Sequence, residues 1–204
     1  MESNIKNLII DFGGVLIDLN RKRCIDAFKA LGVTDIEQMI DPYLQQGLFL
    51  KLEKGEITSS EFRDEIRKRT ETLITDKQIN KAWNCFLVGI PTYKLDLLLK
   101  LREQYTVYLL SNTNEIHWKW ACENCFAYQE FQVQDYFEKM YISFIMHQVK
   151  PAKEIFETLL DDSGIDPAET LFVDDAIANC QVAESLGIKT YMPEAEEDWS
   201  HIFE

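Results

Sequence analysis

The chain has 204 residues, 46% of them hydrophobic and 27% charged, and a formal net charge of −14 at pH 7. A chain of this size can bury a core without a disulfide or a metal, as one domain with an insertion or as two small domains. The acidic surplus, with no clustered basic face, argues against nucleic-acid and membrane partners, and no apolar run is long enough to span a bilayer. We expect a cytoplasmic protein, monomer or homodimer, since the N-terminus leads directly into a strand and leaves no room for a signal peptide.

The first predicted strand is the apolar run 7–11, which ends on Asp11. Such a run is typical of a parallel strand buried on both faces. A carboxylate at its carboxyl end costs free energy unless it is paired. Gly13 and Gly14 follow, and they allow the backbone to turn and to approach a ligand closely. The stretch therefore indicates a buried strand that presents an acid beside a tight turn.

Residues 19–90 form four helical patterns and no convincing strand. Thr58 and Glu61 have the spacing of a capping box at the start of the third helix, and Pro91 ends the fourth. The apolar residues of the four faces are Cys24, Phe28 and Leu31; Ile36, Met39, Ile40, Tyr43 and Leu44; Phe62 and Ile66; and Ile79, Ala82, Trp83, Phe86 and Leu87. We predict a helical cap at 19–90, inserted into a core made of 1–18 and 91–204. An insertion at a strand's carboxyl end lies over the crevice where α/β sheets bind ligands, so it is interpreted as a lid.

Beyond the cap, apolar strand patterns alternate with helical patterns. The strands are predicted at 105–111, 139–145, 170–174 and 187–192, and the helices at 94–103, 113–127, 152–162 and 177–186. This alternation is typical of parallel β-α units. The predicted fold class is therefore α/β, a doubly wound parallel sheet with a helical cap after strand one. The aromatic residues of 113–137 are interpreted as packing against the sheet rather than as a site.

Polar clusters follow four of the predicted strands. They are Asp11; Ser111, Asn112 and Thr113; Lys150; and Asp174 with Asp175. Each cluster alone is ordinary turn or helix-cap material. A doubly wound sheet, however, brings the carboxyl ends of its strands to one edge, where these side chains would meet.

The combined cluster favours phosphate chemistry. Three carboxylates around one point repel one another and attract a hard cation such as Mg²⁺. That cation and Lys150 would offset the charge of a bound phosphate, which Ser111 could help to hold. Asp11 could then attack phosphorus as a carboxylate nucleophile. The sequence contains no serine-hydrolase, P-loop or dinucleotide-binding motif.

These motifs resemble those of the haloacid dehalogenase superfamily over essentially the whole chain. "DFGGVL" is similar to its first motif, Ser111-Asn112 to the second, Lys150-Pro151 to the third and "FVDD" to the fourth. The helical insertion resembles a C1-type cap. Within it, "EKGEITSSEF" is similar to a segment of the branch that contains glucose-1-phosphate phosphatase-like proteins and the amino-terminal domains of epoxide hydrolases.

The resemblance implies a Mg²⁺-dependent phosphatase of a small phosphorylated metabolite, a sugar phosphate being one candidate. Asp11 is then nucleophile and metal ligand, and the Gly13 carbonyl is a further ligand. Asp175 takes the direct metal position with Asp174 behind it, the reverse order being the alternative. Lys150 and Ser111 act in catalysis, and both bind the substrate together with Asn112. Asn179 stands where many relatives have another acid.

One position departs from the superfamily's pattern. Most of its phosphatases have a second Asp two residues after the nucleophile, which serves as general acid and base, and here that residue is Gly13. A leaving group of low pKa, a bound water, or a swing of Asp18 or Glu56 over the substrate could compensate.

Two other functions stay open at this point. A 2-haloacid dehalogenase also lacks the second Asp and needs no metal, although Asp174 and Asp175 argue against it, since neighbouring carboxylates would raise the pKa of Asp11. A member that only binds a ligand is the non-enzymatic alternative. Tyr43 and Phe49 are candidate substrate contacts in the cap.

The five cysteines are scattered and odd in number, as suits a reducing compartment. Cys122 and Cys125 form a single C-x-x-C motif, with His117 as the near candidate for a further zinc ligand. Two thiols on a helix are the favoured interpretation, and zinc is the alternative.

Overall fold

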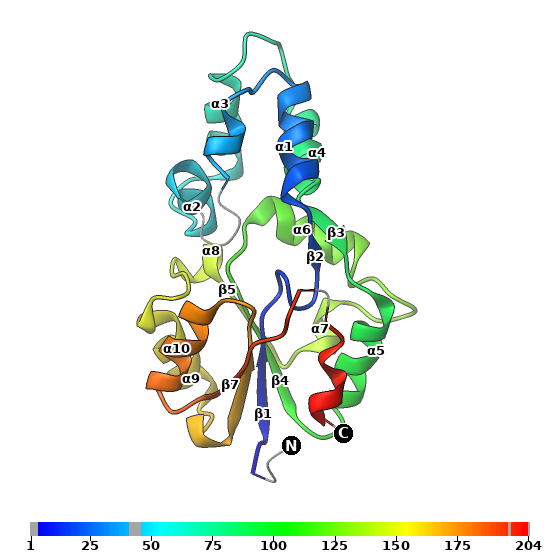
Figure 1. Cartoon of the computed structure of the whole chain (residues 1–204), viewed down its shortest axis with the longest axis vertical. Coiled ribbons are helices and arrows are strands. Elements are labelled where there is room, and N and C mark those ends of the chain that lie inside the picture. The colour runs from blue at the N-terminus through cyan, green and yellow to red at the C-terminus, as the bar shows by residue number, and fades with distance from the viewer. Residues whose placement is uncertain (1–3, 41–45, 196, 204) are drawn as a thin grey trace.

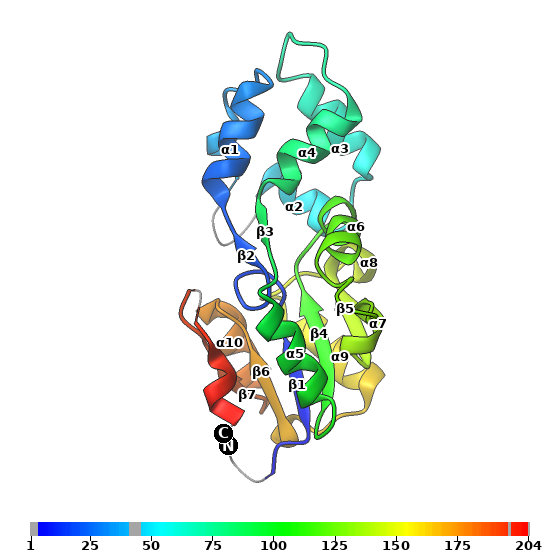
Figure 2. The same ribbon diagram turned by 90° about the vertical axis from the view of Figure 1, so that its right-hand side faces the viewer.

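The computed structural model describes residues 4–40, 46–195 and 197–203. A parallel sheet with helices on both faces forms one half of the elongated molecule, and a group of helices forms the other (Figures 1 and 2). The sheet has the strand order β5-β4-β1-β6-β7. Its strands are β1 (Asn7–Ile10), β4 (Thr106–Ser111), β5 (Lys139–Ile142), β6 (Thr170–Val173) and β7 (Lys189–Tyr191).

The central strand β1 is buried along its whole length and pairs in parallel with both β4 and β6. Its four apolar or amide side chains therefore meet protein on both sides, which is why the sequence shows a continuous apolar run rather than alternation. The predicted fold class, an α/β doubly wound parallel sheet, is confirmed. Asp11 follows β1 directly, at the carboxyl edge of the sheet.

Helices cover the two faces of the sheet unequally. The core on one face contains Ile155 and Phe156 of α9 and Ala183 of α10, packed on Ile9 and Phe172. The other core is continuous with the interior of the helical half. The helices of the sheet half are α5 (Thr92–Leu101), α6 (Glu115–Asn124), α7 (Val133–Tyr136), α8 (Ser143–Met146), α9 (Lys153–Ser163) and α10 (Ile177–Ser185), with 3-10 turns η2 (Pro167–Glu169) and η3 (Trp199–Phe203).

Aromatic side chains join α6 to the first strand-end loop. Phe12 stacks on Phe126 and meets Trp118 edge-on, each with ring centroids 5.8 Å apart. Phe126 in turn contacts Tyr136 and Phe137. The aromatic residues of this region therefore include a buried cluster next to β1, as predicted.

The helical half contains α1 (Arg21–Ala30), η1 (Ile36–Gln38), α2 (Gly47–Glu53), α3 (Ser59–Arg67) and α4 (Asp76–Asn84). The capping box of Thr58 and Glu61 is present at the start of α3, as predicted. A short antiparallel ladder of β2 (Asp18–Leu19) and β3 (Leu87–Gly89) leads into and out of these helices. The predicted cap boundaries at 18/19 and 90/91 fall beside this ladder and stay a prediction.

Two predictions for this half are wrong. Residues 19–90 do contain strand residues, and α4 ends at Asn84 rather than at Pro91, which instead precedes α5. Two paired residues are too few to show an alternation of apolar and polar side chains. Val88 of β3 is half exposed, so the sequence of β3 shows no apolar face directed at the core. Within the pattern 36–44, only η1 is described as helical, and α2 was not predicted.

Phe49 lies in the core of the helical half, fully buried, with its ring 4.6 Å from Trp83 and 5.4 Å from Phe62 between centroids. The suggestion that it contacts substrate is therefore wrong, because its side chain is enclosed by this core and does not line the cavity described below. Tyr43, the other suggested contact, lies outside the described residues. Among those residues, no helix is both long and apolar enough to cross a membrane.

Replacing Phe49 with Ala should lower the free energy of unfolding by about 3–5 kcal/mol, since it empties a space between two large rings. Urea unfolding followed by tryptophan fluorescence measures this change. A Phe49→Ala protein of wild-type stability with a raised KM would instead favour a substrate contact.

Candidate active site

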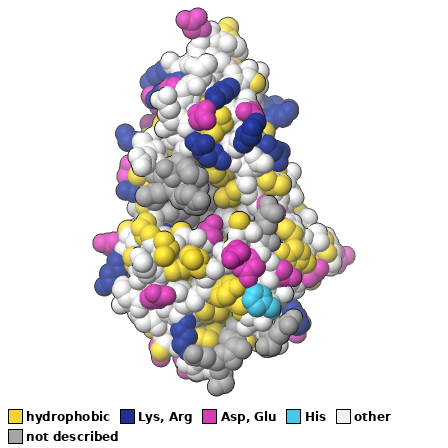
Figure 3. All heavy atoms as spheres, viewed as in Figure 1, with side chains coloured by type: hydrophobic (Ala, Val, Ile, Leu, Met, Phe, Trp, Pro, Cys, Tyr) yellow, Lys and Arg dark blue, Asp and Glu magenta, His cyan; other side chains and the backbone are white. Residues whose placement is uncertain are grey.

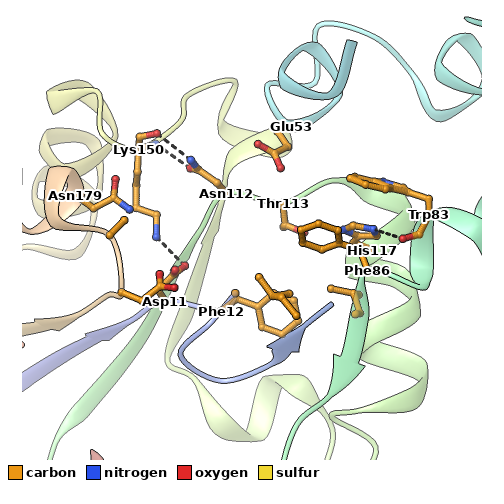
Figure 4. A pocket seen from close by; sticks show the side chains of 15 residues that line it. Asp11, Phe12, Glu53, Trp83, Phe86, Asn112, Thr113, His117, Lys150 and Asn179 are labelled. Carbon is orange, nitrogen blue, oxygen red and sulfur yellow. Dashed lines mark hydrogen bonds and ion pairs between the residues drawn. The ribbon is translucent and has the colours of Figure 1, made fainter. Parts of the chain in front are cut away.

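A cavity opens where the carboxyl edge of the sheet faces the helical half (Figure 4). It encloses about 830 Å³ of empty space, part of it open to solvent. Strand-end loops line one side, and α2, α4, β3 and α6 line the other. The lining residues are Asp11, Phe12, Gly13, Leu19, Glu53, Trp83, Phe86, Leu87, Asn112, Thr113, His117, Lys150, Asp175, Ala176 and Asn179. The polar clusters predicted from four strand ends thus converge, although Ser111 and Asp174 are completely buried and are not among the lining residues.

Lys150 is the buried centre of this arrangement. Its Nζ lies 2.7 Å from Asp11 Oδ1 and 2.6 Å from Asp174 Oδ2, and it donates to the Leu110 carbonyl at 3.0 Å. Burial alone would lower the pKa of Lys150, but the two carboxylates outweigh that effect and raise the pKa above its ordinary value. The ammonium therefore stays charged and ties β1 to β6.

The backbone of Lys150 is held by Asn112. The Lys150 N–H donates to Asn112 Oδ1 at 2.8 Å, and Asn112 Nδ2 donates back to the Lys150 carbonyl at 2.9 Å. Both ends of the side-chain amide are thereby engaged with the protein. Asn112 thereby positions Lys150, and because it also lines the cavity, the substrate-binding role predicted for it stays a prediction.

Asp174 is completely buried and fully hydrogen-bonded. Oδ1 accepts from the Ala176 N–H and from Asn179 Nδ2, both at 2.9 Å, and Oδ2 accepts from Lys150. Asn179 therefore orients the carboxylate from α10, which is the function that sequence analysis left open for it. With these contacts Asp174 serves to hold Lys150.

Asp175 lies next in the chain and is exposed at the cavity wall. Partial burial of its carboxyl group and the charge of Asp174 raise the pKa of Asp175. Its carboxylate approaches Gly14 so closely that a Cβ there would lie 2.1 Å from Oδ2. Because Gly14 also has φ +77°, only glycine suits this turn. The turn at Gly14 is thus in close contact with the Asp175 carboxylate, beside Asp11.

The donor set fits a hard divalent cation. Asp11, Asp174 and Asp175 have carboxylate oxygens within 4.8 Å of one another, the sole such group of three potential ligands found within the described ranges. Burial and the two neighbouring aspartates raise the pKa of Asp11, while Lys150 lowers it. The three carboxylates lie around a single ammonium, that of Lys150. One further positive charge is therefore needed to lower their pKa values enough for all three to be ionised.

Ser111 ends β4 with its hydroxyl completely buried and without a hydrogen-bond partner among the described residues. Its neighbour Thr113 is different, because its backbone N–H donates to Ser143 Oγ and its carbonyl accepts from the same hydroxyl. The unused hydrogen-bonding capacity of the Ser111 hydroxyl is consistent with the predicted phosphate contact, which stays a prediction.

The opposite wall of the cavity is aromatic. His117 of α6 stacks on Trp83 of α4 with centroids 4.1 Å apart, and its Nε2 contacts the Trp83 carbonyl at 3.1 Å. A carbonyl only accepts, so Nε2 carries the proton. Burial lowers the pKa of His117 to about 3, which keeps the imidazole neutral. His117 therefore joins the helical half to the sheet half.

His117 is not placed to complete a zinc site. Its Nε2 is occupied by Trp83, and Cys122 and Cys125 belong to no group of three potential metal ligands in the described part of the chain. Burial raises the pKa of both thiols, as expected for cysteines packed on a helix. The zinc alternative is thus unsupported.

Neither acid suggested as a substitute for the missing Asp lines the cavity. Asp18 lies 3.7 Å from Lys94 Nζ, and Glu56 lies 3.8 Å from Lys54 Nζ on the exposed surface. Glu53, three residues before Glu56, does line it. Sequence analysis quoted Glu53 only as the first residue of "EKGEITSSEF" and did not single it out, because the helix α2 that directs it into the cavity was not predicted.

The chain is similar to known proteins in both sequence and structure. Residues 5–187 match the haloacid dehalogenase-like hydrolase family. The chain is similar to the D-ribitol-5-phosphate phosphatase of Bacteroides thetaiotaomicron, with 40% identity over 195 residues, 96% of this chain and 95% of that protein.

Two solved structures are similar along nearly their full length. A wild-type HAD family enzyme from Bacteroides thetaiotaomicron, in complex with magnesium and inorganic phosphate, has a TM-score of 0.94 and 60% identity, covering 98% of this chain and 100% of that chain. A HAD-like family hydrolase from Porphyromonas gingivalis has a TM-score of 0.91 and 41% identity, covering 98% and 97%.

The depressed pKa of His117 predicts an acid-sensitive fold. The unfolded chain binds a proton near pH 6.5 and the folded chain only near pH 3, so this stabilisation is complete above pH 6.5 and is lost as pH falls toward 3. Between pH 7 and 4.5 the wild type should lose about 2–3 kcal/mol that a His117→Gln variant does not lose. Urea unfolding at both pH values measures the difference, and equal losses in the two proteins would contradict the assignment.

Proposed function

The chain belongs to the haloacid dehalogenase-like hydrolase family, and on this premise we propose that it is a Mg²⁺-dependent phosphatase of a small sugar or polyol phosphate that works through an aspartyl-phosphate on Asp11. The observation that carries the proposal is the convergence of Asp11, Lys150 and Asp175 on one cavity, with the Lys150 ammonium 2.7 Å from Asp11. A nucleophile beside a fixed positive charge suits attack on a phosphate.

Each residue has a distinct task in this scheme. Asp11 Oδ1 is held by Lys150, which leaves Oδ2 to attack phosphorus. The Lys150 ammonium, whose three N–H groups are directed at Asp11, Asp174 and the Leu110 carbonyl, stabilises the charge of the phosphate oxygens through its own charge, and the Ser111 hydroxyl donates to one of these oxygens. The phosphorylated Asp11 is then hydrolysed by water, which releases inorganic phosphate.

The cation site is assigned to Asp11, Asp175 and the Gly13 carbonyl. Bound there, Mg²⁺ would supply positive charge that offsets the charge of the phosphate and the repulsion between the carboxylates. Asp174 is placed behind them, because all of its hydrogen-bonding capacity serves Lys150, Asn179 and the backbone. Asp174 acts through Lys150 and the position of the neighbouring Asp175.

The substrate class follows from the cavity. It has space for a phosphate and a short chain of carbons, and its outer wall mixes the apolar rings of Trp83 and Phe86 with the polar groups of Thr113 and His117. Such a wall suits a molecule with hydroxyl groups on an otherwise aliphatic chain. The similarity to a D-ribitol-5-phosphate phosphatase points to the same class.

The alternative functions have weaker support. A dehalogenase that uses no cation would leave Asp11 beside two aspartates with only Lys150 to balance them. A member that merely binds a ligand would have no need of the Asp11–Lys150 pair. The similarity to a protein named as a phosphatase weighs in the same direction.

Hydrolysis of p-nitrophenyl phosphate tests the proposal directly, because this leaving group needs no proton. We expect turnover with Mg²⁺, none after EDTA, and a fall of at least about 10³-fold in Asp11→Asn, which lacks the nucleophile. Release of p-nitrophenolate is followed by absorbance. Absence of turnover in the folded wild-type protein would refute the proposed activity.

Paired variants separate the two adjacent aspartates. Asp175→Asn should weaken Mg²⁺ binding by about 10–100-fold with little change in thermal stability. Asp174→Asn should instead destabilise the fold by about 3 kcal/mol, because it breaks a buried ion pair. Calorimetric Mg²⁺ titration and thermal unfolding give the two readouts, and the reverse pattern would exchange the roles.

A further inference from the structure

The catalytic arrangement lacks a proton donor for the leaving group. The position two residues after Asp11 is Gly13, where an added Cβ would meet only Leu19 Cδ1 at 3.4 Å. There is space for a side chain at this position, yet none is present. If the chain is a phosphatase as proposed, a proton must reach the leaving oxygen from elsewhere.

The required direction is defined by Asp11. The carboxylate attacks from the end of β1, so an in-line displacement places the leaving oxygen on the far side of phosphorus, toward the helical half. Water that later hydrolyses the phosphorylated Asp11 must enter from the same side. A single acid on the cavity wall opposite Asp11 can therefore serve both steps.

Glu53 occupies that wall. It is the last residue of α2, and its half-buried carboxyl points into the space between the Asp11–Lys150 pair and the Trp83–His117 stack (Figure 4). It makes no hydrogen bond or ion pair with any residue in the described ranges, whereas Glu56 is salt-bridged and exposed. An unpartnered carboxyl in a ligand cavity is free to bond with the ligand.

The end of α2 is anchored to the sheet half just beyond Glu53. The Lys54 carbonyl contacts His147 Nδ1 at 3.0 Å. Gly55, with φ +63°, lies so close to α8 that a Cβ there would be 2.3 Å from the Phe144 carbonyl. Lys54 and Gly55, the turn that directly follows Glu53, are thus packed against the sheet half, which defines the place of Glu53 over the cavity.

We propose that Glu53 is the general acid and then the general base of this enzyme, in place of the acid absent at Gly13. The inference rests on the proposed phosphatase activity. In the first step the bond from Asp11 Oδ2 to phosphorus forms, the ester P–O bond breaks, and the Glu53 proton passes to the leaving oxygen to give the alcohol. In the second step a water oxygen bonds to phosphorus, the Asp11–phosphorus bond breaks, and the water proton returns to Glu53.

The surroundings of Glu53 suit a proton donor near neutral pH. Burial raises the pKa of Glu53 to about 8; the Lys150 charge lowers it and the Asp11 charge raises it. The other titratable groups lining the cavity are His117, which is neutral, and Asp175. The protonated form is therefore accessible before the first step, and the carboxylate after it.

Rapid mixing of Glu53→Gln with two aryl phosphates tests the proposal. With p-nitrophenyl phosphate, whose leaving group needs no proton, we expect a burst of about one p-nitrophenolate per active site followed by slow turnover, because only the second step needs the base. With phenyl phosphate, a more basic leaving group, the first turnover should be slowed by about 10²-fold or more.

The matched control is Glu56→Gln, an exposed acid of the same segment, which should behave as the wild type with both substrates. A wild type that turns over neither substrate refutes the phosphatase itself. If the wild type is active, either of two results overturns the role of Glu53 alone. In one, the Glu53→Gln variant gives no burst with p-nitrophenyl phosphate; in the other, the rate of its first turnover falls by the same factor with both substrates. Thermal unfolding of each variant verifies that the comparison is made between folded proteins.

Discussion

The Lys150 ammonium, buried between Asp11 and Asp174, is the interaction on which the rest of the site depends. A buried charge without partners would be prohibitively costly, so each of the three groups requires the others. The strand ends of β1 and β6 and the loop after β4 must then meet at fixed separations. Asn112, which follows β4, adds a further restraint because its side-chain amide forms two hydrogen bonds with the Lys150 backbone.

The two halves of the molecule divide the chemistry between them. In the proposed mechanism, the sheet half provides the nucleophile and the groups that balance phosphate charge, whereas the helical half provides the wall that the leaving group faces. They are joined by the β2–β3 ladder, by His117 on Trp83, and by the end of α2 on α8. On the face seen in Figure 3, basic side chains gather over the helical half and acidic ones near its junction with the sheet.

Sequence patterns predicted the long buried elements well and the short ones poorly. The continuous apolar run of β1 and the capping box of α3 each have a local physical cause, so they are visible without the fold. The β2–β3 ladder is not, because pairs of residues make a strand only when a partner is brought alongside. Phe49 was mistaken for a substrate contact because α2 was not predicted, so the sequence did not tell which surface its side chain faces.

The sequence by itself determined which chemical groups this protein has and on which strand ends they lie: an acid after β1, a hydroxyl after β4, a lysine before α9 and two acids after β6. It also determined what is missing at Gly13. Only the tertiary structure decided the division of labour between Asp174 and Asp175, and that Glu53 rather than Glu56 faces the cavity. The reason is that neighbouring carboxylates are chemically equivalent in a sequence, and they become different only when packing directs one of them inward and exposes the other.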